Sequence, residues 1–592
     1  MNRAIFMQIL VANIGTSDLA VKPLGIDYYL PIGFDRNEPN EDRQGLTTDE
    51  LELWNNRDQY IELLCNELGE EVKKIAQGDK QFFQVSFRGL TKKILRAYRA
   101  DLDVWDSRLC PGRIGGVLQE AREKHGVTDA YFFVTNHKPE QKGDSIFLYE
   151  ILTLWLKRKN WKLTPHPIFL DPDKPANDQD KMLEEYNKFL CTLPSNSEVY
   201  VSIKGGTPQM ITALKIQTFS ISFKQHLFLE PRLNIKKLLA GEFSDCQVSS
   251  YWQSRRQQKY QVIDLLLKRW DFDGASQVLE DWRGTIQYLI DKKVTEDNIS
   301  EYQKVIDSVN SALKVAIGSL NLDKTHAQAQ REHLAPKLTD LIDHYDHLLN
   351  LYTQCCIFWQ LDRIADFLTR MGSFYEETLH ELIRGLGGEQ YFDRVNYPDD
   401  WYLDTGKLLS DRVLLNNFYN LEKKINAKFK SWNCVYPMDD LYKLLGRPSK
   451  ANFVGALVQT YKAKDLNVCE QLIKAMKQLD YWAEKRNILI HSARGVSRQR
   501  MLEVRVDDNR LVQLREMKNQ KIERSVGNSC LPEEIRYQMA TIAQCTLELM
   551  GISQLSSITA EKRNYLQDPD KEPYYLYSEI RDWVIDRLNQ DL

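Results

Sequence analysis

The chain lacks a long apolar run, and none of its stretches approaches the roughly 20 residues that a membrane helix needs. Its opening segment, Arg3–Val11, has the apolar character of a short signal peptide, but Gln8 interrupts it. The segment then runs into Asn13-Ile14-Gly15-Thr16-Ser17, a turn typical of a strand end. We therefore interpret it as a buried first strand and expect a cytoplasmic protein.

Cysteine is present without the spacing that metal sites require. The 10 cysteines include no C-x-x-C pair, and the adjacent Cys355 and Cys356 suit neither a zinc knuckle nor an easy disulfide. We expect buried thiols in a reducing compartment and no metal cofactor.

The chain has neither a large positive charge nor a common nucleotide-binding motif, and both absences argue against certain functions. With 79 Lys and Arg against 83 Asp and Glu, the net charge is -4, which argues against a surface coated in positive charge for duplex DNA. The chain has no G-x-x-x-x-G-K-[ST] loop and no G-x-G-x-x-G after a strand, which argues against an ATPase or a dinucleotide-dependent dehydrogenase. A local basic pocket for a small anion or a short single strand remains compatible with this charge balance.

What is present, over residues 1–240, is an alternation of short apolar runs and helical patterns. The expected strands are Ile5–Ala12, Ala130–Thr135, Pro167–Leu170, Glu198–Ile203 and His226–Leu229. The expected helices are Ile114–Lys124, Ser145–Arg158, Gln179–Leu190 and Gln209–Ser220. This alternation predicts an α/β domain with a parallel, doubly wound sheet, in which ligands bind beyond the carboxyl ends of the strands.

From about Tyr251 the strand signals fade and long 3.6-residue patterns predominate. We expect three domains: an α/β domain over 1–240, an all-α connector over 241–400 and a second all-α domain over 401–592. Alternating residues around Asp507-Asp508-Asn509 predict a small hairpin near Glu503–Leu511.

Two loops fall at the expected carboxyl edge of the sheet. The first, Asn13–Asp18, follows the first strand, and the second, Lys204-Gly205-Gly206-Thr207-Pro208, opens a helix. Paired glycines allow close approach of a ligand to the backbone, a helix N-terminus offers free N–H groups to an anion, and Lys204 adds a positive charge. A capped βα turn with nothing bound is the alternative.

A second group of polar residues ends a long amphipathic pattern near the C-terminus: Arg486, Asn487 and His491. Asn487 and His491 are four apart and share a helix face, whereas Arg486 lies about 140° from His491 around an ideal helix. One straight helix cannot bring both side chains to one point, so either the helix distorts or two copies meet. Gly495 predicts a nearby helix end, where the helix dipole favours a protonated histidine. The alternative is a surface arginine and a histidine that caps the helix.

The N-terminal pattern resembles the CARF domain, the CRISPR-associated Rossmann-like fold. The resemblance rests on the first turn, the strand Tyr131–Asn136, the helix opening at Asp144-Ser145, the acidic helix Asp178–Leu190, and Gly205–Pro208, in that order. It implies a homodimer that binds cyclic oligoadenylate across its two-fold axis, with tetra-adenylate the commoner ring. The implied ligand contacts are Asn13, Gly15, Thr16, Ser17, Lys204, Gly205, Gly206 and Thr207.

Arg-Asn-x-x-x-His on a long helix resembles the HEPN ribonuclease domain, and CARF followed by HEPN is the architecture of auxiliary ribonucleases of type III CRISPR systems. This resemblance implies antiviral defence by metal-independent cleavage of single-stranded RNA at a composite dimer site, leaving 2′,3′-cyclic phosphate and 5′-hydroxyl ends. Arg486 and His491 would be catalytic, Asn487 would orient or contact RNA, and Arg494 could bind phosphate. Slow cleavage of the bound ring, which some family members perform, stays open.

Two rival functions are a non-enzymatic CARF–HEPN regulator or RNA-binding protein, and a HEPN toxin controlled by a protein antidote. A metal-dependent nuclease is disfavoured, because the C-terminal block has no E-x-K strand motif with a paired acidic residue.

Overall fold

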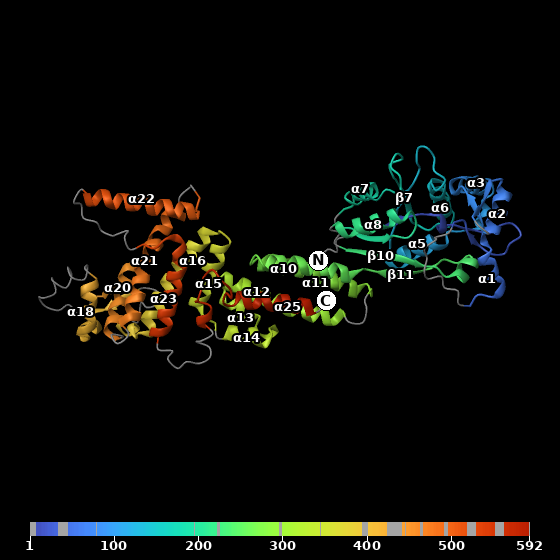
Figure 1. Ribbon diagram of the computed structural model, residues 1–592. Helices are drawn as coiled ribbons and strands as arrows, with labels where there is room; N and C mark the ends of the chain where they lie inside the picture. The colour runs from blue at the N-terminus through green and yellow to red at the C-terminus, as the bar shows by residue number, and fades with distance from the viewer. Residues whose placement is uncertain are drawn as a thin grey trace. The chain divides into compact units, whose positions relative to one another are not determined.

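The computed structural model divides into two compact units (Figure 1). The first comprises Met1–Gln258 and Asp281–Ser300, and the second comprises Lys259–Glu280 and Glu301–Leu592. The structure describes residues 7–33, 45–77, 80–194, 196–221, 225–294, 299–343, 345–393, 401–422, 441–444, 446–461, 466–490, 495–517, 529–550 and 562–590. The predicted division of the helical half at residue 400 stays a prediction.

The first unit is built on a 6-stranded sheet with the order β11-β10-β9-β1-β7-β8. Its strands are β1 (Gln8–Asn13), β7 (Asp129–Val134), β8 (Thr164–Phe169), β9 (Glu198–Ser202), β10 (Gln225–Arg232) and β11 (Asp245–Ser249). All neighbours pair in parallel except β10 and β11, which pair antiparallel. The predicted parallel α/β sheet is therefore confirmed, with an antiparallel edge strand that the sequence pattern did not predict.

Helices on both faces of the sheet make it doubly wound. They are α5 (Gly112–His125), α6 (Ile146–Arg158), α7 (Gln179–Leu190) and α8 (Pro208–Ser220), as predicted within two residues at each end. Apolar residues of α7 and α8, among them Met182 and Leu214, share one core with alternate residues of the central strands, such as Val11 and Val201. This two-residue period is what a sheet buried on both faces requires.

The strand order reverses at β1. The chain passes from β1 to β7 and β8 on one side, and returns to place β9 and β10 on the other. In doubly wound sheets such a switch point opens a crevice at the carboxyl ends of the two central strands. The loops after β1 and β9, both predicted to bind ligand, leave the sheet at this point.

The long connection between β1 and β7 carries elements that the sequence pattern did not indicate. They are η1 (Thr16–Asp18), β2 (Ala20–Val21), β3 (Leu30–Pro31), α1 (Thr48–Asn55), α2 (Arg57–Leu68), β4 (Val72–Gln77), β5 (Lys80–Val85), α3 (Phe87–Ala100), α4 (Leu102–Asp106) and β6 (Leu109–Cys110). The hairpin of β4 and β5 and the small sheet β3-β2-β6 are antiparallel.

The exposed edge strand β8 is protected by proline. The N–H groups of Thr164 and Leu170 donate to β7 and its flanks, at 2.8 Å to Thr128 O and 3.1 Å to Val134 O. Pro165 and Pro167 occupy the alternate positions, where an N–H would point away from the sheet. The two prolines thus remove two N–H donors from the free edge, a common device against edge-to-edge aggregation.

The amino edge of the sheet contains a buried acidic residue held by several donors. Glu198, the first residue of β9, is only 4% exposed. Its Oε1 accepts hydrogen bonds from the hydroxyls of Tyr200 and Tyr288 at 2.6 Å each and lies 2.6 Å from Nζ of Lys292. Burial alone would raise the pKa of this carboxyl, but the hydrogen bonds from Lys292 and both tyrosines lower it below its ordinary value. The interaction ties the sheet to α11 (Phe272–Asp291), which carries Tyr288.

The described residues of the second unit form helices and a short two-stranded sheet of β12 (Tyr402–Asp404) and β13 (Leu441–Lys443). Its helices are α12 (Ile299–Leu320), α13 (Lys324–Ala329), α14 (Pro336–Asp343), α15 (His347–Gln360), α16 (Ile364–Gly385), α17 (Thr405–Ser410), α18 (Arg412–Leu421), α20 (Gly446–Tyr461), α21 (Leu466–Ile490), α22 (Arg498–Met517), α23 (Ile535–Leu549) and α25 (Tyr577–Gln590). The helical pair α10 (Trp252–Leu267) and α11 contributes residues to both units.

The predicted hairpin at Glu503–Leu511 is wrong, because this segment lies inside α22. Met501 is fully buried, and Asp508 bonds to Lys485 and Tyr481 of α21 at 2.6 and 3.0 Å. These contacts join residues that are far apart in the sequence, and they favour a helix over the hairpin that the residues around Asp507-Asp508-Asn509 suggested.

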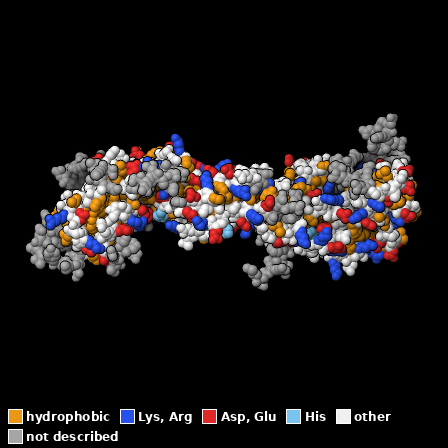
Figure 2. All heavy atoms as spheres, turned by 90° about the horizontal axis from the view of Figure 1, so that it is seen from below, with side chains coloured by type: hydrophobic (Ala, Val, Ile, Leu, Met, Phe, Trp, Pro, Cys, Tyr) orange, Lys and Arg blue, Asp and Glu red, His pale blue; other side chains and the backbone are white. Residues whose placement is uncertain are grey.

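The nearly balanced charge of the sequence is visible on the surface, where Lys and Arg are interspersed with Asp and Glu over the face that Figure 2 shows. Cys355 and Cys356 are free and fully buried, as predicted for core thiols. Within the described ranges, no helix combines the length and apolarity of a membrane span.

A buried histidine predicts how the stability of the first unit depends on pH. His226 of β10 is 2% exposed, next to Phe219 and Phe228. Burial and, secondarily, the charge of Arg255 lower the pKa of His226 to about 3. An unfolded histidine titrates near pH ~6.5, so the stabilising effect of a neutral His226 is complete above that pH and is lost as the pH falls toward 3.

We expect this histidine to cost the first unit about 2 kcal/mol of stability when the pH is lowered from about 7.5 to about 5. His226→Phe, which removes the titrating group, should lack this component. Hydrogen exchange of peptides covering β9 and β10, corrected for intrinsic rates, measures the difference. Equal pH dependence in both proteins would contradict the assignment.

Candidate functional site

The loops after β1 and β9 touch at the switch point of the sheet. A methyl group built on Gly15 would lie 2.7 Å from the backbone N of Gly206, and one on Gly205 would lie 3.0 Å from the backbone O of Asn13. Gly205 and Gly206 have φ of +94° and +76°, which disfavour residues with a side chain. The paired glycines are therefore required by both backbone conformation and the closeness of the two loops.

The structure brings most of the predicted ligand residues to this one place. Gly15, Thr16 and Ser17 are half-buried, Gly206 is exposed, and Lys204 is half-buried at the end of β9. The arrangement combines backbone N–H groups, a lysine and the N-terminus of α8, which suits an anionic ligand such as a phosphate.

Two of the predicted side chains also have structural roles. The Thr207 hydroxyl caps α8 by accepting from Met210 N at 3.2 Å, and donates to Ala176 O at 2.5 Å. The Ser17 hydroxyl accepts a hydrogen bond from Arg113. The second loop therefore does contain the helix cap that the alternative interpretation predicts. Because the Thr207 hydroxyl already donates to Ala176 O, Thr207 could contact a ligand only through its backbone or by accepting a second hydrogen bond.

Asn13 is fully buried at the end of β1, where its Oδ1 accepts a hydrogen bond from Tyr186 of α7 at 2.6 Å. Burial raises the pKa of Tyr186 well above its ordinary value, so the phenol stays a neutral donor. The Nδ2 atom of Asn13 has no hydrogen-bond partner among the described residues. A buried donor of this kind is uncommon, and it lies at the carboxyl end of β1.

A buried ion pair that no sequence pattern singled out supports the first loop. Asp18, at 2% exposure, accepts from the Gly15 N–H at 2.7 Å and lies 3.3 Å from Nε of Arg113, which is also 2% exposed. Arg113 is near the start of α5, so the pair ties the loop to that helix. The only sequence signal was an arginine at an otherwise apolar and glycine-rich helix start.

The Asp144-Ser145 motif occupies the carboxyl end of the neighbouring strand β7. The Asp144 carboxylate is completely buried and accepts from Arg88 at 3.0 Å and from the backbone N–H of His137 at 3.1 Å. Ser145 exchanges hydrogen bonds with Thr135. The motif closes the loop between β7 and α6 and so shapes the same edge of the sheet.

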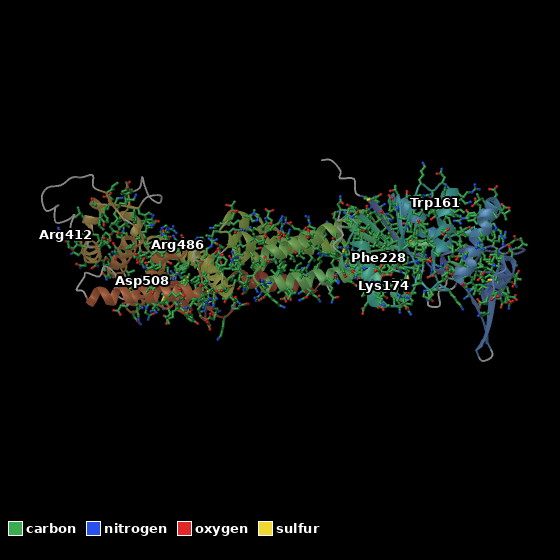
Figure 3. The ribbon with its side chains drawn as sticks, turned by 90° about the horizontal axis from the view of Figure 1, so that it is seen from above. Trp161, Lys174, Phe228, Arg412, Arg486 and Asp508 are labelled. Carbon is green, nitrogen blue, oxygen red and sulfur yellow. The ribbon has the colours of Figure 1, made fainter. Side chains whose placement is uncertain are left out.

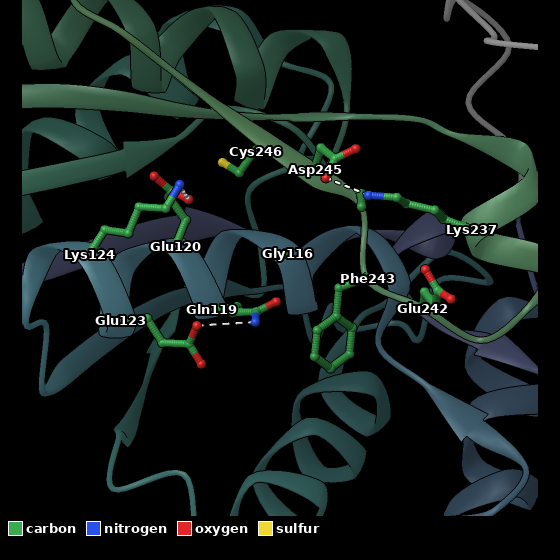
Figure 4. A pocket seen from close by; sticks show the side chains of 11 residues that line it. Gly116, Gln119, Glu120, Glu123, Lys124, Lys237, Glu242, Phe243, Asp245 and Cys246 are labelled. Carbon is green, nitrogen blue, oxygen red and sulfur yellow. Dashed lines mark hydrogen bonds and ion pairs between the residues drawn. The ribbon is translucent and has the colours of Figure 1, made fainter. Parts of the chain in front are cut away.

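A separate cavity of about 410 Å³ lies against the flank of α5 (Figure 4). Its charged lining residues are Glu120, Glu123, Glu242, Asp245, Lys124 and Lys237. None of the predicted ligand residues lines it, and both lysines are already paired, Lys124 with Glu120 at 2.8 Å and Lys237 with Asp245 at 2.6 Å.

In the second unit, the predicted catalytic helix is α21. Its apolar stripe is buried as predicted, with Leu472, Leu479 and Trp482 at 0% exposure. Arg486 follows Leu479 by seven residues and Trp482 by four, so it lies on the same face of α21 as this stripe. It is half-buried there, and Asn487 is exposed. His491 and Arg494 lie outside the described residues, and the helix is described as far as Ile490.

Arg486 of α21, labelled in Figure 3, has no carboxylate partner among the described residues. Its one hydrogen bond is donated by Nε to Oδ1 of Asn487 at 3.4 Å. The cations nearby are paired: Lys485 with Asp508 at 2.6 Å, Arg447 with Asp480 at 3.8 Å, and Lys450 with Glu376 at 3.7 Å. Arg486 therefore retains donors for an anion, and a guanidinium can bind a phosphate through two parallel hydrogen bonds.

No family model and no curated protein matches the chain. Among solved structures, it is similar to Enterococcus italicus Csm6 bound to cyclic hexa-2′-fluoro-hexa-dAMP, with 12% sequence identity and a TM-score of 0.47. The match covers 98% of this chain and 100% of that chain.

The buried pair of Arg113 and Asp18 gives a test of how the first loop is held. Arg113→Leu should lower the free energy of unfolding of the first unit by about 3–5 kcal/mol, because it removes the guanidinium that balances the charge of the buried Asp18 carboxylate. Arg99→Leu is the matched control: it breaks the pair with Glu150 at 2.6 Å, but the Arg99 side chain is 60% exposed. Its cost should stay below about 1 kcal/mol.

Urea unfolding of the two variants compares these costs directly. Equal destabilisation by both substitutions would mean that the Arg113 pair does not hold the loop.

Proposed function

We propose that this chain is a homodimeric, cyclic-oligoadenylate-activated ribonuclease that cuts single-stranded RNA without a metal. The observation that carries the proposal is the half-buried Arg486 guanidinium, which has no carboxylate partner among the described residues and lies five positions before His491 on the same predicted helix. An unpaired arginine close to an amide and a histidine is suited to binding and cleaving a phosphodiester.

In the proposed reaction, the 2′-oxygen of the RNA forms a bond to the adjacent phosphorus and the bond to the 5′-oxygen breaks. The 2′-hydroxyl gives its proton to solvent, and His491 donates a proton to the departing 5′-oxygen. Arg486 stabilises the charge that builds up on the phosphorane, and Asn487 orients the arginine or the RNA. The products are a 2′,3′-cyclic phosphate and a 5′-hydroxyl, and no water is consumed.

Helix geometry is compatible with a site built from two copies. Arg486 and His491 are about 140° apart on an ideal helix, so a straight helix through both would direct them to different points, and either a distortion of the helix or a second copy must bring them together. A dimer in which two such helices face one groove would let the arginine of one copy act with the histidine of the other. The domain assignment that goes with this proposal is CARF over 1–240, connector over 241–400 and HEPN over 401–592.

The ligand site of the proposal is the crevice between β1 and β9. Close backbone approach at Gly15, Gly205 and Gly206, the charge of Lys204 and the α8 N-terminus favour a phosphate-bearing ligand. Adenine edges would find amide and hydroxyl groups in the Asn13–Ser17 loop. We propose cyclic tetra-adenylate as the activator, and activation requires that the ring bind the cleaving arrangement more tightly than the resting one.

Removing Arg486 or His491 tests the chemistry. In EDTA and with a saturating ring, Arg486→Ala and His491→Ala should each slow RNA cleavage by at least about 100-fold, because each removes a group that acts in the transition state. Lys477→Ala removes an exposed cation from the same helix and should leave the rate unchanged. Gel analysis of end-labelled RNA gives the rates. Undiminished cleavage by either catalytic variant would refute the assignment.

Replacing Lys204 tests the ligand site. Lys204→Ala should raise the ring concentration for half-maximal activation by roughly 10–100-fold, the cost of one charge-assisted hydrogen bond. The maximal rate at saturating ring should be retained. Lys188→Ala, an exposed lysine near the end of α7, is the control for loss of one charge. A panel of rings of three to six adenylates sets the ring size, and an unchanged response in Lys204→Ala would rule out this site.

A further inference from the structure

We propose that Gly372 is a positioning residue for the catalytic Arg486, which it allows to lie against the backbone of α16. This inference rests on the proposed function, and it assigns a role to a residue outside the Arg-Asn-x-x-x-His motif. Gly372 is 114 residues before Arg486 in the chain and is buried in the middle of a 22-residue helix.

A glycine at this position has no local reason to be there. It lies within the regular helix Ile364–Gly385, and its φ is not among the positive values of the described chain. Alanine would stabilise the interior of a helix by about 1 kcal/mol relative to glycine. The cause must therefore be in what the residue faces.

What it faces is the end of the Arg486 side chain. A methyl group built on Gly372 would overlap Nη1 of Arg486 and would lie 3.2 Å from its Cζ and 3.4 Å from its Cδ. All three of the nearest atoms belong to Arg486. The space that a Cβ would fill is thus occupied by the guanidinium, which packs on the helix backbone.

This packing restricts an otherwise weakly held group. Among the described residues Arg486 has no ion pair, and its single hydrogen bond, to Asn487 Oδ1, is long at 3.4 Å. A flexible side chain with few partners samples many rotamers, whereas catalysis needs it within a fraction of an ångström of one position. The contact with Gly372 limits the guanidinium on one side, and the residue as a whole is half-buried, so part of it remains exposed to solvent.

The same contact indicates that Gly372→Ala should move the guanidinium of Arg486 without destabilising the fold. The atom that an alanine methyl would displace most is the far end of a flexible side chain, so the backbone of α16 and α21 need not move. Gly372→Ala should fold normally, with a melting temperature equal to or above that of the wild type, but with its guanidinium displaced.

The test is a double-mutant cycle on kcat/KM for RNA cleavage, measured in EDTA with a saturating ring and enzyme in excess. Gly372→Ala should lower kcat/KM by roughly 10–100-fold, the effect of displacing a catalytic group by about 1 Å. In an Arg486→Ala background the same substitution should have no further effect. Gly284→Ala is the matched control, because Gly284 is interior to α11 and has no atom within 4 Å of the built methyl.

Each outcome decides the proposal. Loss of activity in Gly372→Ala, no further loss in the double variant and an undiminished melting temperature support it. Wild-type activity in Gly372→Ala, an equal loss in both backgrounds, or a lowered melting temperature would overturn it. If Arg486→Ala itself cleaves at the wild-type rate, the proposed function fails, and that result is distinct from an active Gly372→Ala beside an inactive Arg486→Ala.

Discussion

The position of β1 between β7 and β9 determines how the first unit can work. The chain adds strands first on one side of β1 and later on the other. The loops after β1 and β9 therefore start side by side at the switch point of the sheet and lead to opposite sides. The approach of these loops is so close that Gly15, Gly205 and Gly206 leave no room for side chains. The buried pair of Asp18 and Arg113 then fixes the first loop, and the Thr207 cap fixes the second. The two loops are therefore held close together at the carboxyl end of β1 and β9, with glycine where their backbones meet.

In the second unit, ion pairs of Lys485, Arg447 and Lys450 connect α21 and the helices packed near it. Arg486 has no carboxylate partner among the described residues, so its guanidinium retains donors for an anion. The missing side chain at Gly372 gives that guanidinium a defined place. Stability and proposed catalysis thus depend on different residues of the same helix bundle.

Periodicity and capping residues in the sequence predicted the secondary structure of several elements correctly. They could not predict contacts between residues that are far apart in the chain. The parallel strands, the helices α5 to α8 and the buried stripe of α21 all followed from periodicity and from caps such as Thr207-Pro208. The Gly205-Gly206 loop was recognisable because two adjacent glycines at a strand end indicate a tight turn with an open backbone.

The misses share a physical cause: they depend on contacts between residues far apart in the chain. The segment around Asp507-Asp508-Asn509 alternates like a hairpin, but Asp508 bonds to Lys485 and Tyr481, and the helix α22 forms instead. Arg113, 95 residues from Asp18, and Gly372, far from Arg486, have no local pattern that marks their partners. His491 lies outside the described residues, so its part in the site stays a prediction.

The central claim is that a ring bound in the first unit switches on metal-free RNA cleavage in the second. The most direct measurement is the initial rate at which the purified full-length protein cuts single-stranded RNA in EDTA, with and without cyclic oligoadenylates of three to six adenylates. We predict that one ring size raises the rate strongly and that the products carry 2′,3′-cyclic phosphate ends. A rate that no ring changes, or cleavage that appears only when a divalent metal is added, would contradict this claim.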